Sequence, residues 1–513
     1  MKKLYQVFLS IIVVLLFSSC QSGQTYKITF YDDVNSLYFE TSKKANESID
    51  LPNDPVKEMF IFTGWDKDVP HFMPKKDLVF VATWELNKSS NEQVNALYTV
   101  LLENYYLDLN VDLRGIKEVY ELYDYLDPYT FLYQESSRGI DQDENYVGLG
   151  ITVNQLEEGL LIVNINNASE IDKYLYVGDL VTSVDGVLLK DVPADDRIPL
   201  ILGEVGTKRT IGVVRFESYY EFDYYLKEIN NESVEYELFG SVGYIYINRF
   251  GADTHNKFRV ALETLEKNEI TELVIDVRND GGGYLTAVVD ILYHFIVDSD
   301  PFLIIKDIKG EIEYDYNPLA TEKKNYGITV LVNERSASAS EVLAEALKQE
   351  GYHVFGTQTF GKDVFQGGYY IGRRFPNIFE ENIILNYTAG YWLPNNRINV
   401  KNGVTPTKYH EQTGVHNYLY PVLFEKLSVG DEDDLIETFQ YLVSRETSYK
   451  DISNKFTSDF EEALKIYQAN NSLIVDGELN LETQMHLIDY YRFLIKNKEY
   501  DEQLVDLLNE LNK

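Results

Sequence analysis

An alternation of short apolar strands with helical stretches, between residues 242 and 350, most constrains how this chain can fold. The segments "VGYIYINRF" (242–250), "ELVIDVR" (272–278) and "ITVLVN" (328–333) are short and largely apolar, as buried strands are. The stretches between them, "HNKFRVALETLEKN" and "YLTAVVDILYHFI", are typical of helices. The pattern predicts an α/β core in which helices cover buried strands.

The junction after the third strand is a candidate site for chemistry. The strand ends at Asn333, and "ERSAS" leads into the helix "EVLAEALKQE", which is expected to stop at Gly351. A serine at such a junction lies near unpaired backbone N–H groups and the positive end of the helix dipole, where developing negative charge is stabilised. The junction therefore suits an acyl-transfer nucleophile. The ordinary alternative is that these serines only cap the helix.

A serine nucleophile needs a base, and the seven histidines show no arrangement that nominates one. The chain has no GxSxG motif, and residues 89–412 contain no Ser-x-x-Lys pair. Lys362 lies in the apolar segment "TFGKDVF", and burial can lower a lysine pKa from about 10.4 to near 7, where the amine acts as a base. In an extended segment, Gln366 returns to the same face and could hold the amine without adding charge. The alternative is that Lys362 is a solvated surface cation.

Four segments in order resemble the C-terminal processing protease family of serine peptidases, family S41. They are "LVIDVRNDGGG", "SASASE", "TFGKDVFQ" and "YTAGYWLPNNRINVKNGVTP", and the resemblance spans roughly residues 92–412. It implies an α/β protease core of the ClpP/crotonase type, a polypeptide substrate, and no metal or organic cofactor. It also implies roles for single residues: Ser338 as nucleophile, Lys362 as general base, Gln366 as the residue that orients the lysine, and the backbone N–H groups of Gly282 and Ala339 as the oxyanion hole.

The chain departs from this family at several positions. Residues 279–283 read "NDGGG" where the family usually has "NNPGG", so a proline is lost and Asp280 brings a negative charge near the forming oxyanion. The segment from Ser338 to Lys362 is one residue shorter than usual, and Asp363 replaces a glycine. Two rival hypotheses follow. The chain is a catalytically inactive surface scaffold or peptide-binding protein built on this fold, or the nucleophile is the neighbouring Ser336 or Ser340.

Residues 145–217 contain "YVGLGITV" and "VGDLVTSVDGV", which together resemble a PDZ domain. The resemblance implies that the loop of Gly148, Leu149 and Gly150 receives a chain-terminal carboxylate, and that Ile151 begins the strand which a bound peptide extends. This β-rich domain would be inserted into the protease. The alternative is a glycine-rich hairpin in an ordinary β module.

Both flanks of the protease region resemble small modules. Residues 26–86 alternate apolar and polar positions, and "FIFTGWDKD" and "FVATWE" resemble the internalin-type B-repeat, a β-grasp-like module with Gly64, Trp65 and Trp84 as landmarks. The function would be adhesion or spacing, unless the tryptophans are simply core residues.

The C-terminal hundred residues are predicted to be helical. Residues 459–487 resemble a peptidoglycan-binding helical module, with landmarks at Gln468, Asp476, Gly477 and Thr483. The module implies the cell wall as a partner. The alternative is a helical cap on the enzyme.

The first 20 residues, "MKKLYQVFLSIIVVLLFSSC", carry two lysines and an apolar run from Leu4 to Phe17 that is short for a membrane span. They predict an export signal. Cys20 is the only cysteine, and its place after Ser18 and Ser19 resembles a bacterial lipobox, which implies lipidation of Cys20 and an anchor on the outer side of the cell membrane. Phe17 stands where the lipobox usually has leucine, so plain secretion or an uncleaved anchor remains open. The formal net charge of -37 argues against a nucleic-acid partner.

The sequence thus predicts a multidomain protein. The predicted parts are a lipoprotein signal peptide (1–19), a linker (20–25), the B-repeat-like β module (26–86), an N-terminal helical part of the protease (92–140), the PDZ-like domain (145–217), the catalytic core (218–412), a helical linker (413–452) and the peptidoglycan-binding-like helical module (453–513).

Overall fold

The computed structural model describes residues 24–33, 36–57, 59–135, 146–166, 170–216, 218–229, 232–297, 301–314, 322–398 and 400–512. The predicted signal peptide and Cys20 lie outside these residues. The chain forms two compact units: unit 1 comprises residues 1–133 and 368–387, and unit 2 comprises residues 134–367 and 388–513. Across the described ranges, no helix combines the length and apolar character that crossing a bilayer requires.

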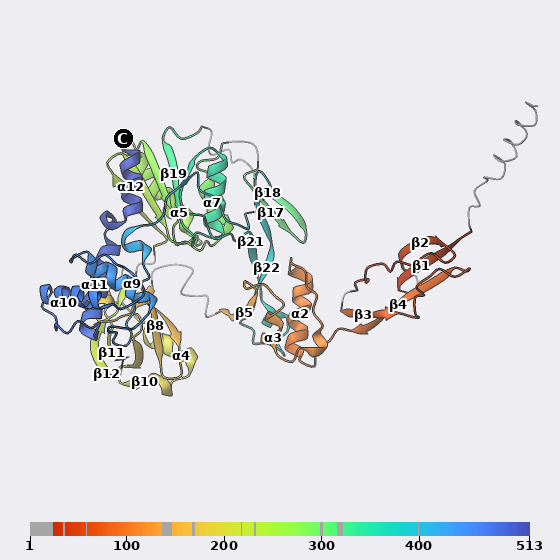
Figure 1. The fold of residues 1–513 in the computed structure, drawn as a ribbon, viewed down its shortest axis with the longest axis horizontal. Helices are drawn as coiled ribbons and strands as arrows, with labels where there is room; N and C mark the ends of the chain where they lie inside the picture. Colours follow the sequence, from red (N-terminus) through yellow and green to blue (C-terminus); the bar gives the residue numbers. More distant parts are fainter. Residues whose placement is uncertain are drawn as a thin grey trace, which may run out of the picture. The chain divides into compact units, whose positions relative to one another are not determined.

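Unit 1 begins with a four-stranded sheet in the order β2-β1-β4-β3 (Figure 1). The strands are β1 (Thr25–Asp33), β2 (Ser36–Lys44), β3 (Phe60–Trp65) and β4 (Leu78–Leu86), and β1 runs parallel to β4. Trp65 packs edge-on against the buried Phe30 ring at 4.7 Å, and Trp84 Nε1 donates to the Asp32 carbonyl oxygen at 2.8 Å. Both tryptophans therefore take part in the internal contacts of this module.

The rest of unit 1 is a helical cluster completed by a distant segment. Its elements are α2 (Glu92–Asn104), α3 (Val119–Tyr123), β5 (Phe131–Gln134), α8 (Ile371–Arg374) and the first half of β22 (Ile383–Pro394). The Asn91 side chain accepts the Gln93 N–H and caps α2. The buried face of α2 shares one core with Ile371, Phe379 and Leu385, so residues 368–387 complete the core of the N-terminal helices.

In unit 2, the PDZ-like segment forms a sheet in the order β12-β11-β9-β8-β7, with β10 paired to β9. The elements are β6 (Tyr146–Gly148), β7 (Ile151–Gln155), β8 (Leu160–Ile165), β9 (Leu180–Val184), β10 (Val187–Leu188), α4 (Ala194–Leu200), β11 (Lys208–Arg215), β12 (Ser218–Tyr225) and β13 (Lys227–Ile229). The predicted end at residue 217 is wrong, because β12 pairs with β11 from Ser218 to Tyr225 and β13 pairs with β6.

The α/β core of unit 2 is a six-stranded sheet in the order β14-β15-β16-β19-β20-β23. Its strands are β14 (Val234–Phe239), β15 (Val242–Ile247), β16 (Glu272–Asp276), β19 (Gly327–Val332), β20 (His353–Gly356) and β23 (Lys408–Tyr409), and its helices are α5 (Thr254–Glu266), α6 (Leu285–Leu292) and α7 (Ala339–Gln349). The strands from β15 to β23 are parallel, so their carboxyl ends share one edge. The strands predicted at 242, 272 and 328 are confirmed.

Both faces of this sheet are covered. On one face, Ile245, Ile275 and Val330 share a core with α5, α6 and α7. On the other face, Tyr244, Val274, Leu331 and Phe355 pack against Leu504 and Leu507 of α12 (Glu502–Leu511). Alternate residues of each strand therefore face opposite helical layers, which explains why the strands are apolar throughout. A further sheet contains β17 (Leu303–Asp307), β18 (Gly310–Tyr314), β21 (Val364–Tyr369) and β22.

The C-terminal helices divide differently from the predicted linker and module. Helices α9 (Asp434–Ser444), α10 (Ser458–Asn470) and α11 (Leu481–Lys496) share one core that includes Phe439, Phe460 and Leu487. The predicted linker at 413–452 is therefore wrong for α9, whose apolar face is buried in the same cluster as the following helices. Helix α12 is not part of this cluster, because its leucines pack against the second face of the α/β sheet.

The four landmarks of the peptidoglycan-binding resemblance form an internal network. The Gln468 amide nitrogen donates to Asp476 Oδ1 at 2.9 Å and to Thr483 Oγ1 at 3.0 Å, and its oxygen accepts the Gly477 N–H at 2.9 Å. Gln468 and Thr483 are fully buried. This network joins α10 to α11, with Asp476 itself exposed, and binding to peptidoglycan stays a prediction.

Candidate active site

The turn into α7 holds Ser338 in an unusual backbone conformation. Ser338 is the residue that precedes the helix, its φ is 57° and its ψ is -114°, and it is 6% exposed. Residues other than glycine rarely adopt a positive φ, because this backbone conformation is strained. The strain persists where the surrounding structure enforces it, often at the turn that carries a nucleophile. The strained serine at the carboxyl edge of the sheet is therefore the first element of a candidate active site.

The two serines that flank Ser338 hold this turn in place. The Ser336 hydroxyl donates to the Val277 carbonyl oxygen at 2.7 Å, and the Ser340 hydroxyl donates to the Asp280 carbonyl oxygen at 3.0 Å. Both serines are fully buried. Their hydroxyls therefore join the turn to the segment after β16, and this structural role accounts for both serines without a catalytic one.

A glycine loop lies directly against the Ser338 turn. Gly282 has a φ of 99°, and a Cβ added to it would lie 2.8 Å from Ser338 Cβ and 2.9 Å from the Ala339 nitrogen. Gly283 has a φ of 150°, and its added Cβ would lie 2.2 Å from the Phe250 carbonyl oxygen. Only glycine fits at both positions. The structure thus brings together the backbone of Gly282, Ser338 and Ala339, three residues that the sequence predicts to share a site.

A simple oxyanion hole requires a free N–H group, but the Gly282 N–H is already hydrogen-bonded. It donates to Asp280 Oδ1 at 2.8 Å. Asp280 is fully buried, and burial raises the pKa of its carboxyl to about 7, although the Gly282 N–H, the nearby Ser340 hydroxyl and the charge of Arg249 act in the opposite direction. The sequence indicated a charge at this position, but the structure places it in a site that favours the neutral acid.

The Glu341 carboxylate connects the Ser338 turn with the loop that carries Lys362. Glu341 is fully buried, and its oxygens accept four hydrogen bonds. The donors are Ser338 N at 2.9 Å and Lys362 N at 2.8 Å to Oε2, and Thr359 Oγ1 at 2.6 Å and Gly361 N at 2.7 Å to Oε1. A charged acceptor for several N–H groups gives strong, directional contacts.

One oxygen atom therefore holds the backbone of both candidate catalytic residues. Ser338 N and Lys362 N lie within 2.9 Å of the same Glu341 Oε2. On the other side, the Lys362 carbonyl oxygen accepts Trp392 Nε1 at 2.8 Å, and Trp392 is buried. Glu341 was not singled out from the sequence, although a glutamate three residues after a helix-capping serine is the signal of a capping box.

Gln366 lies on β21, which begins at Val364, so this segment is extended, the condition under which Gln366 was expected to return to the face of Lys362. Its amide nitrogen is buried and has no hydrogen-bond partner among the described residues. A polar atom in this situation is unusual inside a protein, because leaving it unpaired costs free energy.

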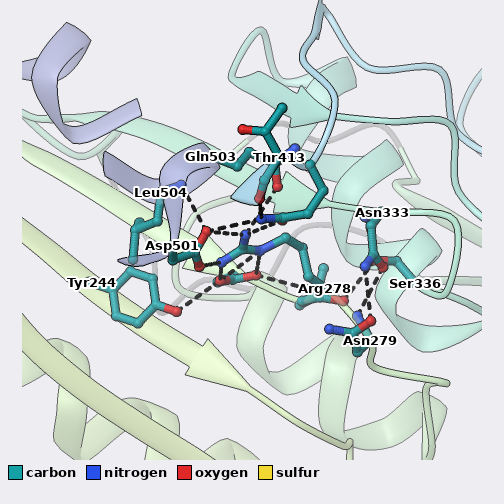
Figure 2. Close-up of polar contacts among 12 residues, drawn as sticks. Tyr244, Arg278, Asn279, Asn333, Ser336, Thr413, Asp501, Gln503 and Leu504 are labelled. Atoms are coloured by element: carbon teal, nitrogen blue, oxygen red, sulfur yellow. Dashed lines mark hydrogen bonds and ion pairs between the residues drawn. The ribbon is translucent and has the colours of Figure 1, made fainter. Parts of the chain in front are cut away.

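A buried charge cluster lies immediately before the glycine loop (Figure 2). The Arg278 guanidinium donates to Asp501 Oδ2 at 2.6 Å, to Asp276 Oδ2 at 2.6 Å and to Gln503 Oε1 at 3.0 Å. Tyr244 donates to the same Asp276 oxygen at 2.8 Å. The start of α12 is thus joined to the end of β16, from which the glycine loop departs.

Asn279 and Asn333 form a second link at this edge. The Asn279 N–H donates to Asn333 Oδ1 at 2.9 Å, and Asn333 Nδ2 donates to Asn279 Oδ1 at 3.0 Å. Figure 2 shows this pair beside Ser336. The pair holds the glycine loop against the end of β19, next to the Ser338 turn.

Asp501→Asn is expected to lower the free energy of unfolding at pH 7. Burial acts to raise the pKa of Asp501, but the charge and hydrogen bonds of Arg278 outweigh it and lower this pKa to about 2, from a usual 3.8. Because the folded pKa is the lower one, the stabilisation is present above pH 3.8 and is lost as the pH falls through 2. The shift corresponds to about 2 kcal/mol.

Chemical denaturation at several pH values checks this expectation. The matched control is Asp506→Asn, because Asp506 lies on α12, which Asp501 caps, and is exposed, with an ion pair to His410. We expect the control to change stability by less than about 0.5 kcal/mol. Equal effects of the two variants at pH 7 would contradict a stabilising role for the Arg278–Asp501 pair.

The PDZ-like sheet presents the predicted binding strand at its edge. β7 is the last strand in the sheet order, so one of its sides is unpaired within the described part of this sheet. Gly150 has a φ of 73° and its carbonyl oxygen accepts the Asn166 N–H at 2.8 Å, while Leu149 is buried in the core. Gly148 contacts Leu202 through an isolated bridge. The predicted residues Gly148, Leu149, Gly150 and Ile151 thus lie together at one end of this edge strand.

Comparison with known proteins gives one family. Residues 241–409 match peptidase family S41. A "probable CtpA-like serine protease" of Staphylococcus saprophyticus is 27% identical over 430 residues, which cover 82% of this chain and 86% of that protein. A protein of the same name from Staphylococcus aureus is 28% identical over 447 residues, covering 83% and 86%. The solved structure of a photosystem II D1 C-terminal processing protease aligns with a TM-score of 0.40 and 20% identity, over 62% of this chain and 92% of that chain.

Proposed function

Because residues 241–409 form a peptidase family S41 domain, we propose that this protein is a serine endopeptidase whose nucleophile is Ser338 and whose general base is Lys362. The observation that carries the proposal is the shared contact of Glu341 Oε2 with the backbone nitrogens of Ser338 and Lys362. The strained conformation of Ser338 and the structural hydrogen bonds of Ser336 and Ser340 support the choice among the three serines.

The proposed reaction is acyl transfer through a covalent intermediate. The Ser338 hydroxyl oxygen attacks the scissile carbonyl carbon while the neutral Lys362 amine takes its proton. The N–H groups of Gly282 and Ala339 stabilise the oxyanion. Lys362 then passes the proton to the leaving amine, which departs with the C-terminal product. A water molecule, deprotonated by the same lysine, releases the acyl group and restores Ser338. In this scheme Gln366 orients the lysine amine.

We propose that the PDZ-like domain captures substrate by strand addition. The open edge of β7 supports this role, because an extended peptide can add to such an edge with main-chain hydrogen bonds. In the proposed arrangement the loop of Gly148, Leu149 and Gly150 receives the substrate carboxylate, and Ile151 begins the pairing strand. A free C-terminus would then improve capture.

We also propose that the protein is exported and anchored by a lipid on Cys20. The support is the sequence alone, since the lipobox-like segment lies outside the described residues. Metabolic labelling with a tagged fatty acid in bacteria that produce the wild type or Cys20→Ser tests this directly. Label on the wild type and none on the variant is expected, and an unlabelled wild type would contradict lipid anchoring.

Cleavage of an unfolded protein tests the proposed peptidase activity. Purified protein is incubated with a permanently unfolded polypeptide, and new termini are identified by mass spectrometry. We expect discrete new termini, at the same rate with and without a chelator. A second pair of substrates, one with a free and one with an amidated C-terminus, tests capture by the PDZ-like domain. The free carboxylate should lower KM. Equal KM values would contradict carboxylate recognition.

An inactive scaffold is the second candidate, and one observation favours it. The Gly282 N–H is already bonded to Asp280, so the oxyanion hole is not open in this conformation. A scaffold would bind peptide at the β7 edge but produce no new termini. The same assay therefore separates the two functions.

A further inference from the structure

Asp280 lies between the glycine loop and the Ser338 turn. Its backbone carbonyl oxygen accepts the Ala337 N–H at 2.9 Å and the Ser340 hydroxyl at 3.0 Å. Its side chain turns back to its own loop, where Oδ1 accepts the Gly282 N–H at 2.8 Å. The hydrogen bond between Asp280 and Gly282 therefore lies next to Ser338, and a change in its strength affects the backbone that surrounds this serine.

The second carboxyl oxygen of Asp280 is in an unusual situation. Asp280 is fully buried, and Oδ2 has no hydrogen-bond partner among the described residues. An ionised carboxylate normally gathers several donors, and burying it with one neutral donor is unfavourable. With one N–H on Oδ1 and no donor on Oδ2, the contacts of Asp280 are poor for a carboxylate.

The surrounding groups do not reverse this preference. Arg249, in the segment after β15, favours the charged form, as do the Gly282 N–H and the Ser340 hydroxyl of α7, but burial dominates and raises the pKa of Asp280 to about 7. Tyr246 of β15 faces the same region, and its own pKa is raised by burial and further by the charges of Asp276 and Asp280. A tyrosine that is neutral at pH 7 offers no compensating positive charge.

We propose that Asp280 is a positioning residue that opens or closes the oxyanion hole: the neutral acid yields the Gly282 N–H to the reaction oxyanion, whereas the carboxylate retains this N–H and repels the oxyanion. The inference rests on the protease function proposed above. A charged acceptor holds an N–H more strongly than a neutral one, so ionisation strengthens the competing Asp280–Gly282 contact. It also places a negative charge beside a second, forming negative charge in a buried site.

The consequence is a pH dependence with two opposing contributions. Neutral lysine is needed as the base, so cleavage is expected to rise with pH. Ionisation of Asp280 multiplies this rate by a factor that falls through about pH 7, by about tenfold for each further pH unit, so the wild-type rate falls by this factor relative to a variant that cannot ionise here. Asp280→Asn keeps the shape of the side chain and an oxygen that accepts the Gly282 N–H, but it cannot ionise. The variant should retain activity and lose this falling factor.

The test is kcat/KM from pH 5 to pH 9 for the wild type, Asp280→Asn and the control Asp290→Asn. Asp290 lies on α6 shortly after the glycine loop and is exposed, so its variant should follow the wild type. At pH 8 we expect Asp280→Asn to exceed the wild type by about tenfold relative to their ratio at pH 6. A ratio of the two rates that stays the same across this pH range, or an inactive Asp280→Asn at every pH, would overturn the proposal.

A second measurement does not depend on catalysis. The folded pKa of Asp280 lies above its usual 3.8, so the wild type loses stability relative to Asp280→Asn as the pH rises from 4 to 7, and the difference is constant above 7. Thermal unfolding at pH 4, 5.5 and 7 measures it. A difference that does not grow over this range would show that Asp280 is not held as a neutral acid. Absence of cleavage by the wild type at every pH would instead refute the protease function, and with it the proposed role, while the unfolding data still report the ionisation.

Discussion

Ser338→Ala is expected to lower the cleavage rate by at least about a thousandfold, because it removes the atom that forms the acyl intermediate. Lys362→Ala should have an effect of similar size, since the hydroxyl then lacks its base. The two losses should not add, because both residues serve the same chemical step. Initial rates on an unfolded protein for the two single variants and the double variant measure this.

The neighbouring serines are the matched controls for Ser338. Ser336→Ala and Ser340→Ala each remove one buried hydroxyl that donates to a backbone carbonyl oxygen. Each is expected to cost about 1 to 2 kcal/mol of stability while a large part of the activity remains. If Ser338→Ala stays active and either neighbour loses turnover while folded, the nucleophile is assigned to the wrong serine.

Glu341→Ala is expected to damage stability and activity together. It leaves four donors without their acceptor, and two of them, the Ser338 N–H and the Thr359 hydroxyl, are buried. At about 1 to 3 kcal/mol for each of these two, the free energy of unfolding should fall by about 2 kcal/mol or more. Because two of the four donors belong to Ser338 and Lys362, the catalytic residues should also lose their mutual alignment. Denaturation midpoints and kcat measure the two effects.

Glu341→Gln is the milder substitution, to be used if Glu341→Ala does not fold. The amide retains a single oxygen, so either the Ser338 and Lys362 pair or the Thr359 and Gly361 pair loses its acceptor. We expect kcat to fall more than tenfold with a smaller change in KM. Glu345→Gln, one turn later in α7, is the control, because Glu345 is also buried and the hydrogen bonds it accepts among the described residues come from the side chains of Lys348 and Gln349 on its own helix. A kcat for Glu341→Gln equal to that of the control would show that Glu341 does not align the site.

The elements around the candidate site could be predicted because their patterns are local. β15, β16 and β19 are apolar runs bounded by turn residues, and α7 begins at a serine-rich junction and ends near Gly351, whose φ of 90° suits a helix end. These signals lie within about ten residues of chain. They gave the right strands with ends one to three residues too long. For β15 and β16, the buried Phe250 and Val277 continue the apolar pattern beyond the strand end.

The contacts that assemble the site could not be read in the same way. Glu341 and Lys362 are 21 residues apart, and Arg278 and Asp501 are 223 residues apart. Neither pair follows a helical or strand period, so no local pattern marks it. That the Gly282 N–H is available to an oxyanion was expected from the resemblance alone, and no local pattern in the sequence indicates that this N–H donates to the Asp280 side chain.

The C-terminal region was misdivided for a related reason. The apolar stripes of α9 and α12 each predict a buried face, but a stripe does not identify its partner. α9 joins α10 and α11, whereas Leu504 and Leu507 of α12 cover the α/β sheet. The boundary predicted at residue 452 therefore separates α9 from α10 and α11, with which α9 shares a core. It also groups α12 with α10 and α11, although α12 packs against the α/β sheet.

The most direct test of the account is covalent labelling with a serine-reactive phosphonofluoridate, followed by peptide mapping. The account predicts one stoichiometric adduct on Ser338 in the wild type, a rate of labelling that falls by at least about a hundredfold in Lys362→Ala, and no adduct on Ser336 or Ser340. An unreactive Ser338 in folded wild-type protein, or labelling that proceeds equally fast without the lysine, would contradict a hydroxyl activated by Lys362.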